Sequence, residues 1–172
     1  MAKRHGEIAT TVANQQSTLK LPSAWLRNIV HQVLSGEKVT SAKISIALVS
    51  DSDIQRIHRQ FLQHDVPTDV ITFPYSARGA SCLTGEIVIS TDTAQAVATE
   101  FAHPAENEVA LYLIHGLLHL CGYDDHDPHD REAMRKRESH YLELLSIKLK
   151  DYPSVRKQNP AAHSRAKKKR RS

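Results

Sequence analysis

Residues 113–130 read LIHGLLHLCGYDDHDPHD, and the pattern of this stretch predicts a metal-binding helix followed by a tight turn. His115 and His119 are four residues apart, a spacing that places both imidazoles on one face of a helix, about one turn apart. A glycine after the helix can adopt the positive φ that turns the chain back. Asp125 and His126 follow this turn, and either could supply a third ligand. Three protein ligands with one open position are typical of catalytic zinc sites, so we predict one bound zinc ion.

The stretch is similar to the zinc-binding helix of zincin metalloproteases, whose pattern is HExxHxxGxxH. Gly116 stands where zincins carry the glutamate that acts as general base, which argues against metal-dependent peptide hydrolysis. Counted from His119, the third-ligand position falls on Asp125, which we favour, with His126 as the alternative. Two histidines on an apolar helix can also be buried and hydrogen-bonded without a metal, but the Asp/His cluster that follows them favours a metal site.

The composition is that of an ordinary globular protein. The chain has 172 residues, of which 40% are hydrophobic and 24% are charged, enough for one core. No stretch approaches the roughly 18 apolar residues of a membrane span, and the N-terminus lacks the apolar segment of a secretory signal. Cys82 and Cys121 cannot make a disulfide framework, and the apolar context of Cys121 favours packing over metal ligation. We therefore expect a cytoplasmic protein with no membrane and no disulfide partner.

Positive charge is concentrated at the C-terminus. Residues 151–172 contain eight lysines and arginines and one acid, a net charge of +7, so residues 1–150 carry −3 of the total of +4. We expect residues 1–150 to form one domain and residues 151–172 to be a disordered basic tail. Such a tail attracts polyanions without sequence preference. RNA contact is one interpretation of the tail, and a merely solubilising segment is the other.

Hydrophobic periodicity predicts an α+β domain: a small mixed four-stranded sheet with about five helices packed around it, one of them the zincin-like metal helix. Strands are predicted at residues 8–13, 43–50, 68–73 and 85–90. Helices are predicted at residues 22–34, 51–62, 91–101, 106–120 and 127–149. The second helix is expected to be capped by Asp51 or Ser52, and the third by Thr91 or Asp92.

Three short motifs occur in the chain: PTDVITFP at residues 67–74, GEIVIS at residues 85–90 and HGLLHLCGYD at residues 115–124. In this order they resemble the PTDVLSFP, GDIxIS and HGxLHLxGYDH motifs of the YbeY family of bacterial endoribonucleases. The similarity runs over roughly residues 40–145. The resemblance implies a single-strand-specific, metal-dependent endoribonuclease that acts in rRNA processing and ribosome quality control. Its partners would be an rRNA precursor and the ribosome.

The resemblance also implies roles for individual residues. The family's third ligand is a histidine, whereas the aligned residue here is Asp125, followed by His126; aspartate is itself a competent zinc ligand. Arg59 falls where the family has an arginine thought to act in catalysis, and a guanidinium suits contact with a scissile phosphate. Without the resemblance, Arg59 would be read as a solvated helix residue. His115 is expected to serve catalysis as a ligand, and Asp69 is a candidate acceptor for a ligand histidine N–H.

Two other functions are consistent with a metal site. One is a metal-dependent hydrolase that acts on a substrate other than RNA, although the glycine at position 116 counts against a peptidase. The other is a non-catalytic ribosome-associated factor with a structural metal, although structural zinc sites are usually closed by four ligands. A mildly acidic domain is unusual for an RNA enzyme, so phosphate contacts would come from a local patch or from the tail.

Overall fold

The computed structural model describes residues 6–63, 68–77 and 80–152. Along the chain the elements are β1 (Ile8–Asn14), α1 (Ser23–Gly36), β2 (Ala42–Val49), α2 (Asp51–Leu62), β3 (Val70–Pro74), β4 (Leu83–Ser90), α3 (Thr91–Phe101), α4 (Ala105–Leu120) and α5 (Pro128–Leu144). The predicted tail, apart from Asp151 and Tyr152, lies outside these described residues, as does Pro67 of the first motif. Within the described ranges, none of the helices has the length and apolar character that a membrane crossing requires.

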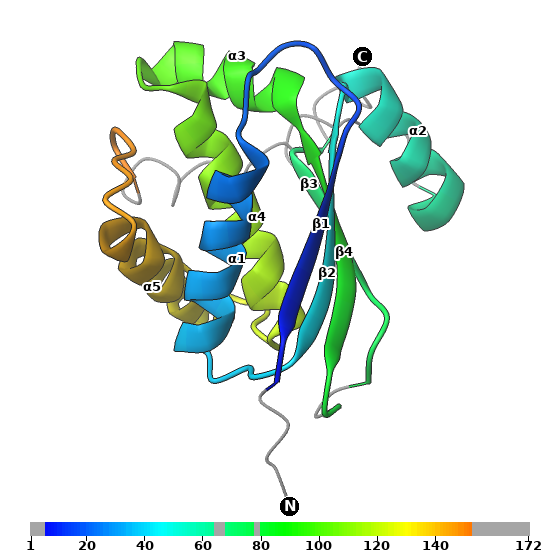
Figure 1. Ribbon diagram of the computed structural model, residues 1–172. Coiled ribbons are helices and arrows are strands. Elements are labelled where there is room, and N and C mark those ends of the chain that lie inside the picture. The colour runs from blue at the N-terminus through cyan, green and yellow to red at the C-terminus, as the bar shows by residue number, and fades with distance from the viewer. Residues whose placement is uncertain (1–5, 64–67, 78–79, 153–172) are drawn as a thin grey trace, which may run out of the picture.

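The strands form one mixed sheet in the order β1-β2-β4-β3 (Figure 1). Strands β1, β2 and β4 run parallel, and β3 runs antiparallel to β4. Helices α1 and α4 cover one face, α5 packs against α4 on the outside, and α2 lies on the opposite face (Figure 1). The predicted α+β fold, with a four-stranded mixed sheet and helices around it, is confirmed.

Side-chain alternation along the strands divides the core into two clusters. Ile87 and Ile89 of β4 point into the main core under α1 and α4, whereas Val88 points into a smaller cluster under α2. Helix α4 is the most deeply buried element. From Glu108 to Leu120 each of its residues is buried except the two histidines, which are partly exposed. The histidines are therefore the positions where solvent or a ligand can reach this part of the helix.

Gly116 allows α4 to lie directly on the sheet. A Cβ atom at this position would lie 2.9 Å from Cγ2 of Ile87 and 3.1 Å from Oγ1 of Thr72. Both neighbours are β-branched residues with stiff side chains, so a larger residue at position 116 pushes α4 away from β3 and β4. The glutamate that zincins carry here has no room between the helix and the sheet.

The predicted caps of α2 and α3 are wrong by one or two residues. The caps are Ser50 and Ser90, which stand where β2 and β4 end. Each serine hydroxyl accepts a hydrogen bond from the backbone amide three residues later, at 3.2 Å from Asp53 and 3.1 Å from Thr93. The chain thus passes from strand to helix with no intervening loop, and the residues predicted as caps lie in the first helical turn.

The last helix is shorter than predicted. It ends at Leu144 rather than Leu149, and the chain turns back at Ser146, whose φ is 56°. The turn places Ile147 and Tyr152, among others, against the main core. Tyr152, which the sequence analysis assigns to the tail, is therefore packed on the folded body.

Candidate metal centre

Helix α4 ends in a Schellman turn centred on Gly122, whose φ is 102°. The amide of Gly122 donates to the carbonyl of His119 at 3.0 Å, and the amide of Tyr123 donates to the carbonyl of Leu118 at 3.0 Å. A positive φ is unfavourable for a residue with a Cβ atom, so glycine is the residue that suits this position. The turn reverses the chain and returns Asp125 to the face of α4 that carries the two histidines.

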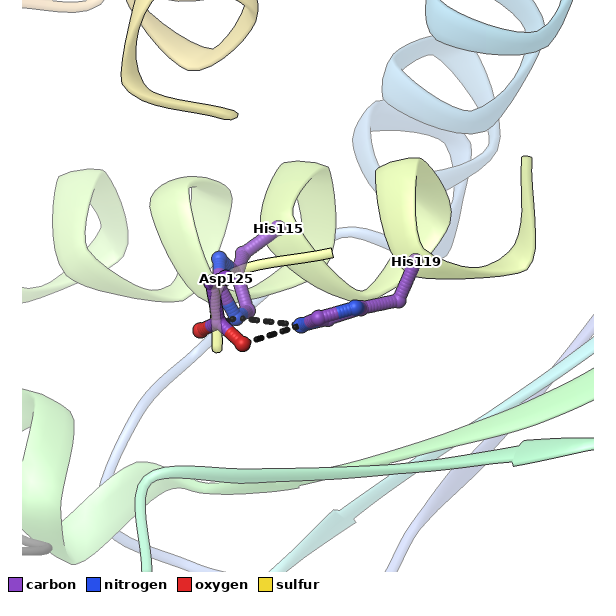
Figure 2. A group of neighbouring side chains, drawn as sticks. All are labelled: His115, His119 and Asp125. Atoms are coloured by element: carbon purple, nitrogen blue, oxygen red, sulfur yellow. Dashed lines mark hydrogen bonds and ion pairs between the residues drawn. The ribbon is translucent and has the colours of Figure 1, made fainter. Parts of the chain in front are cut away.

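Three side chains meet beneath the last turns of α4 (Figure 2). The Nε2 atoms of His115 and His119 are 3.0 Å apart. The carboxylate of Asp125 places one oxygen 3.6 Å from Nε2 of His115 and the other 3.7 Å from Nε2 of His119. Ligand atoms that bind a tetrahedral zinc ion at about 2.0–2.2 Å lie about 3.3–3.6 Å from one another. The spacing of these donor atoms is therefore close to what one shared ion requires.

Hydrogen bonds at Nδ1 of each histidine ring determine that Nε2 is the nitrogen available to bind a metal. Nδ1 of His115 lies 2.6 Å from Oε1 of Glu138, and Nδ1 of His119 lies 2.9 Å from the carbonyl oxygen of Tyr123. A carboxylate and a carbonyl can only accept, so both Nδ1 atoms carry protons, and each ring, when neutral, presents a lone pair at Nε2. Two lone pairs that face each other repel unless a cation lies between them. The donor chemistry therefore fits a divalent metal.

Negative charge surrounds the two rings. Burial by itself lowers the pKa of His115, but the carboxylates of Glu138, Asp69 and Asp125 outweigh it, and the pKa lies above its ordinary value. Burial, together with the charge of the neighbouring His115, lowers the pKa of His119. An environment of carboxylates around two imidazoles stabilises a cation.

The other residues predicted for the site lie elsewhere. The side chain of His126 is 88% exposed, with its Nε2 atom 3.4 Å from a carboxylate oxygen of Asp124. It lies outside the group formed by His115, His119 and Asp125, and belongs to a separate, more exposed group of possible metal ligands with Asp124 and Asp125. Arg59 is exposed in the last turn of α2, a helix that lies on the other face of the sheet from α4 (Figure 1).

Sequence reasoning missed Glu138, the partner of His115, and proposed Asp69 for such a role. Asp69 instead accepts the amide of Val70 at 2.9 Å, at the start of β3. A signal for Glu138 was present in the sequence: it shares the buried face of α5 with Met134 and Tyr141. A carboxylate on the core face of a helix is rare unless it has a partner there.

Helix α5 also holds the turn that carries Asp125. Arg131 donates to the carbonyl oxygens of His126, at 2.7 Å, and Asp125, at 3.3 Å.

Cys121 packs against the main core, which confirms the packing role expected for it. Burial, reinforced by the charge of Glu37, raises the pKa of the Cys121 thiol to about 12. A thiol that stays protonated is a poor metal ligand.

Residues 11–146 match the family model described as Endoribonuclease YbeY. The chain belongs to the YbeY family. Endoribonuclease YbeY of Chlorobium luteolum is 40% identical over 126 residues, which cover 73% of this chain and 90% of the relative. Endoribonuclease YbeY of Carboxydothermus hydrogenoformans is 35% identical over 141 residues, which cover 80% of this chain and 98% of the relative. The YbeY resemblance inferred from three motifs is thereby confirmed.

A solved structure has a similar fold. The solution structure of TM1509 from Thermotoga maritima matches this chain with a TM-score of 0.58 and 27% sequence identity, over 78% of this chain and 89% of that one. The YbeY family match ends at residue 146, so Tyr152 and the basic tail lie beyond it.

Proposed function

We propose that this chain is a zinc-dependent endoribonuclease of the cytoplasm that cuts single-stranded RNA. Its substrates would be rRNA precursors, and its role would lie in rRNA processing and ribosome quality control. The observation that carries the proposal is the convergence of His115, His119 and Asp125, at metal-ligand spacing, in a chain of the Endoribonuclease YbeY family.

In this proposal His115, His119 and Asp125 hold the zinc ion. When bound, zinc would supply Lewis acidity toward a phosphoryl oxygen and make water more acidic. Glu138 and the carbonyl of Tyr123 keep the ring protons on Nδ1, so that each Nε2 faces the ion. The side chains of the three ligands are 24%, 27% and 38% exposed, respectively, so an RNA strand can reach the site from solvent.

The activity is tested with purified wild type, His115→Ala and His31→Ala, each incubated with a single-stranded RNA and with the same RNA as a duplex. His31 is an exposed histidine of α1 and serves as the matched control. We expect wild type and His31→Ala to cut the single strand. His115→Ala should be slower by at least about 100-fold, since loss of even an outer contact to a ligand costs about 10- to 100-fold. Equal cleavage by wild type and His115→Ala would assign the activity to a contaminating nuclease.

The ligand set is tested by zinc affinity, measured by competition with a chromogenic chelator. Asp125→Ala should weaken zinc binding by at least about 100-fold, because it removes a donor oxygen. His126→Ala should leave the affinity within about 2-fold, because that ring lies outside the group of three. The reverse result would make His126 the third ligand.

The proposal gives Arg59, on the basis of the family resemblance, a contact with a phosphate of the bound RNA strand. Its support is the family position and an exposed guanidinium in the last turn of α2, a group suited to bidentate phosphate contact. Arg56, on the same helix, is the matched control; its side chain is 71% exposed and forms an ion pair with Asp53. Arg59→Ala should slow cleavage at least about 10-fold with zinc affinity unchanged, whereas Arg56→Ala should match wild type. Equal rates for both variants would remove Arg59 from the mechanism.

A further inference from the structure

A segment beyond the family match reaches the metal centre through helix α5. The hydroxyl of Tyr152 donates to Oε2 of Glu138, and Oε1 of the same carboxylate lies 2.6 Å from Nδ1 of His115. One carboxylate thus joins a C-terminal tyrosine to a histidine of the donor group. We propose that Tyr152 is a positioning residue that orients Glu138 and thereby tightens metal binding at His115. This inference rests on the zinc site proposed above.

Burial makes the orientation of Glu138 important. The residue is 4% exposed, so its two carboxylate oxygens depend on partners within the protein. With Oε2 held by the Tyr152 hydroxyl, the carboxylate cannot rotate freely, and Oε1 stays in place for the His115 ring. Burial first, and then the charge of Glu138, raise the pKa of Tyr152, so the phenol remains a neutral donor.

The segment that carries Tyr152 is itself anchored. The side-chain amide of Asn107 donates to the carbonyl of Lys148 at 2.8 Å, and the amide of Lys150 donates to Nδ1 of His103 at 3.3 Å. These two bonds attach the segment to the start of α4 and to the loop before it. The ring of Tyr152 also packs against the main core. The hydroxyl is therefore delivered to Glu138 by a fixed stretch of chain.

The inference is tested by the zinc affinity of full-length Tyr152→Phe, which keeps the ring and removes only the hydroxyl. Partners that contact a ligand directly change metal affinity by about 10- to 100-fold, so a residue one contact further out should change it about 3- to 10-fold. The matched control is Tyr75→Phe, which removes an exposed hydroxyl bonded to Glu86 at 2.9 Å. The control should stay within about 2-fold of wild type.

A double-mutant cycle separates positioning from general packing. Glu138→Gln should itself weaken zinc binding, and Tyr152→Phe should then cause no further loss, because the hydroxyl acts through the Glu138 carboxylate. Tyr152→Leu, which also lacks the hydroxyl, should show the same dependence on Glu138 and guards against a folding defect particular to one variant. An equal loss of affinity in both backgrounds, or no loss in wild type, would overturn the inference.

The outcomes distinguish this inference from the proposed function. If wild type cuts RNA and binds zinc while Tyr152→Phe binds zinc equally well, only the role of Tyr152 falls. If wild type binds no zinc, the zinc site and the role of Tyr152 fall together.

Discussion

Glu37→Gln should destabilise the protein at neutral pH and should do so progressively less in acid. Glu37 directly follows α1, and its carboxylate accepts hydrogen bonds from three groups. These are the hydroxyl of Tyr141 at 2.6 Å, Nε of Arg137 at 2.9 Å and the hydroxyl of Tyr123 at 3.1 Å. The side chain of Glu37 is 11% exposed. The carboxylate therefore ties α1 to α5 and to the turn that leads to Asp125.

The magnitude follows from these contacts. A hydrogen bond to a charged group contributes about 1.5–3 kcal/mol, and breaking a fully buried ion pair costs about 3–5 kcal/mol. Glutamine keeps the shape and one acceptor oxygen but loses the charge and turns an NH₂ group toward the other partners. Arg137 is 32% exposed and can recover water contacts. We therefore expect Glu37→Gln to lower the free energy of unfolding by about 2–3 kcal/mol at pH 7.

The pH dependence has a definite sign. Burial by itself raises the pKa of Glu37, but hydrogen bonds from Tyr141, Arg137 and Tyr123 outweigh it and hold the pKa below its ordinary value of 4.5. A carboxyl whose pKa is lower in the folded state stabilises fully above its unfolded pKa, and this contribution is lost as pH falls through the folded pKa. The difference between wild type and Glu37→Gln should therefore narrow below pH 4.5.

The assay is urea unfolding of the metal-free protein at pH 7 and at stepwise lower pH. The control is Glu132→Gln on α5, an exposed carboxylate 3.1 Å from Lys136. Its loss should change the free energy of unfolding by less than about 0.5 kcal/mol. A Glu37→Gln protein as stable as wild type at pH 7, or a difference that does not vary with pH, would refute the reasoning.

Three further predictions concern the helix, the turn and the tail. Gly116→Ala should lower the free energy of unfolding by about 1 kcal/mol in urea titrations, because overpacking of about 1–3 kcal/mol exceeds a helix-propensity gain of about 1 kcal/mol; a gain would contradict the close contact with the sheet. Gly122→Ala should cost about 1–2 kcal/mol and weaken zinc binding, because an alanine is strained at a φ of 102°; unchanged stability and affinity would mean that the turn tolerates a Cβ atom. Removal of residues 153–172 should weaken RNA binding and reduce the salt slope of log K by about 0.7 for each lost phosphate contact; an unchanged slope would exclude the tail from RNA contact.

The elements were predictable because their signals are local. The alternation in β2 and β4, the histidine spacing in α4 and the glycine after it depend on few neighbours. The caps were less predictable because Ser50 and Ser90 each stand in a run of residues that can all cap a helix. The position where the strand ends decides which residue serves, and that position depends on pairing with other strands.

The sequence was sufficient to predict the candidate ligands of the site. It was less able to predict which of Asp125 and His126 lies beside the two histidines. Asp125 and His126 both follow Gly122 closely enough to reach the histidines. The amide of Asp125 donates to the carboxylate of Asp124 at 2.7 Å, and Arg131 of α5 holds the carbonyls of the turn. Because the Arg131 contacts need α5 in its docked position, the spacing of residues along the chain does not predict them. The same reason hides Glu138, whose partner His115 lies on another helix.

The three proposed zinc ligands, His115, His119 and Asp125, precede Glu138, the partner of His115, in the order of synthesis. Protein chains emerge N-terminus first, at about 5–20 residues per second. A nascent chain that has been synthesised as far as Asp125 already contains all three donor residues. It still lacks Glu138 and the rest of α5. The ring of His115 is held at its final angle only after α5 has emerged and docked. In the zinc site proposed above, firm capture of the metal would consequently be a late event in the synthesis of this protein.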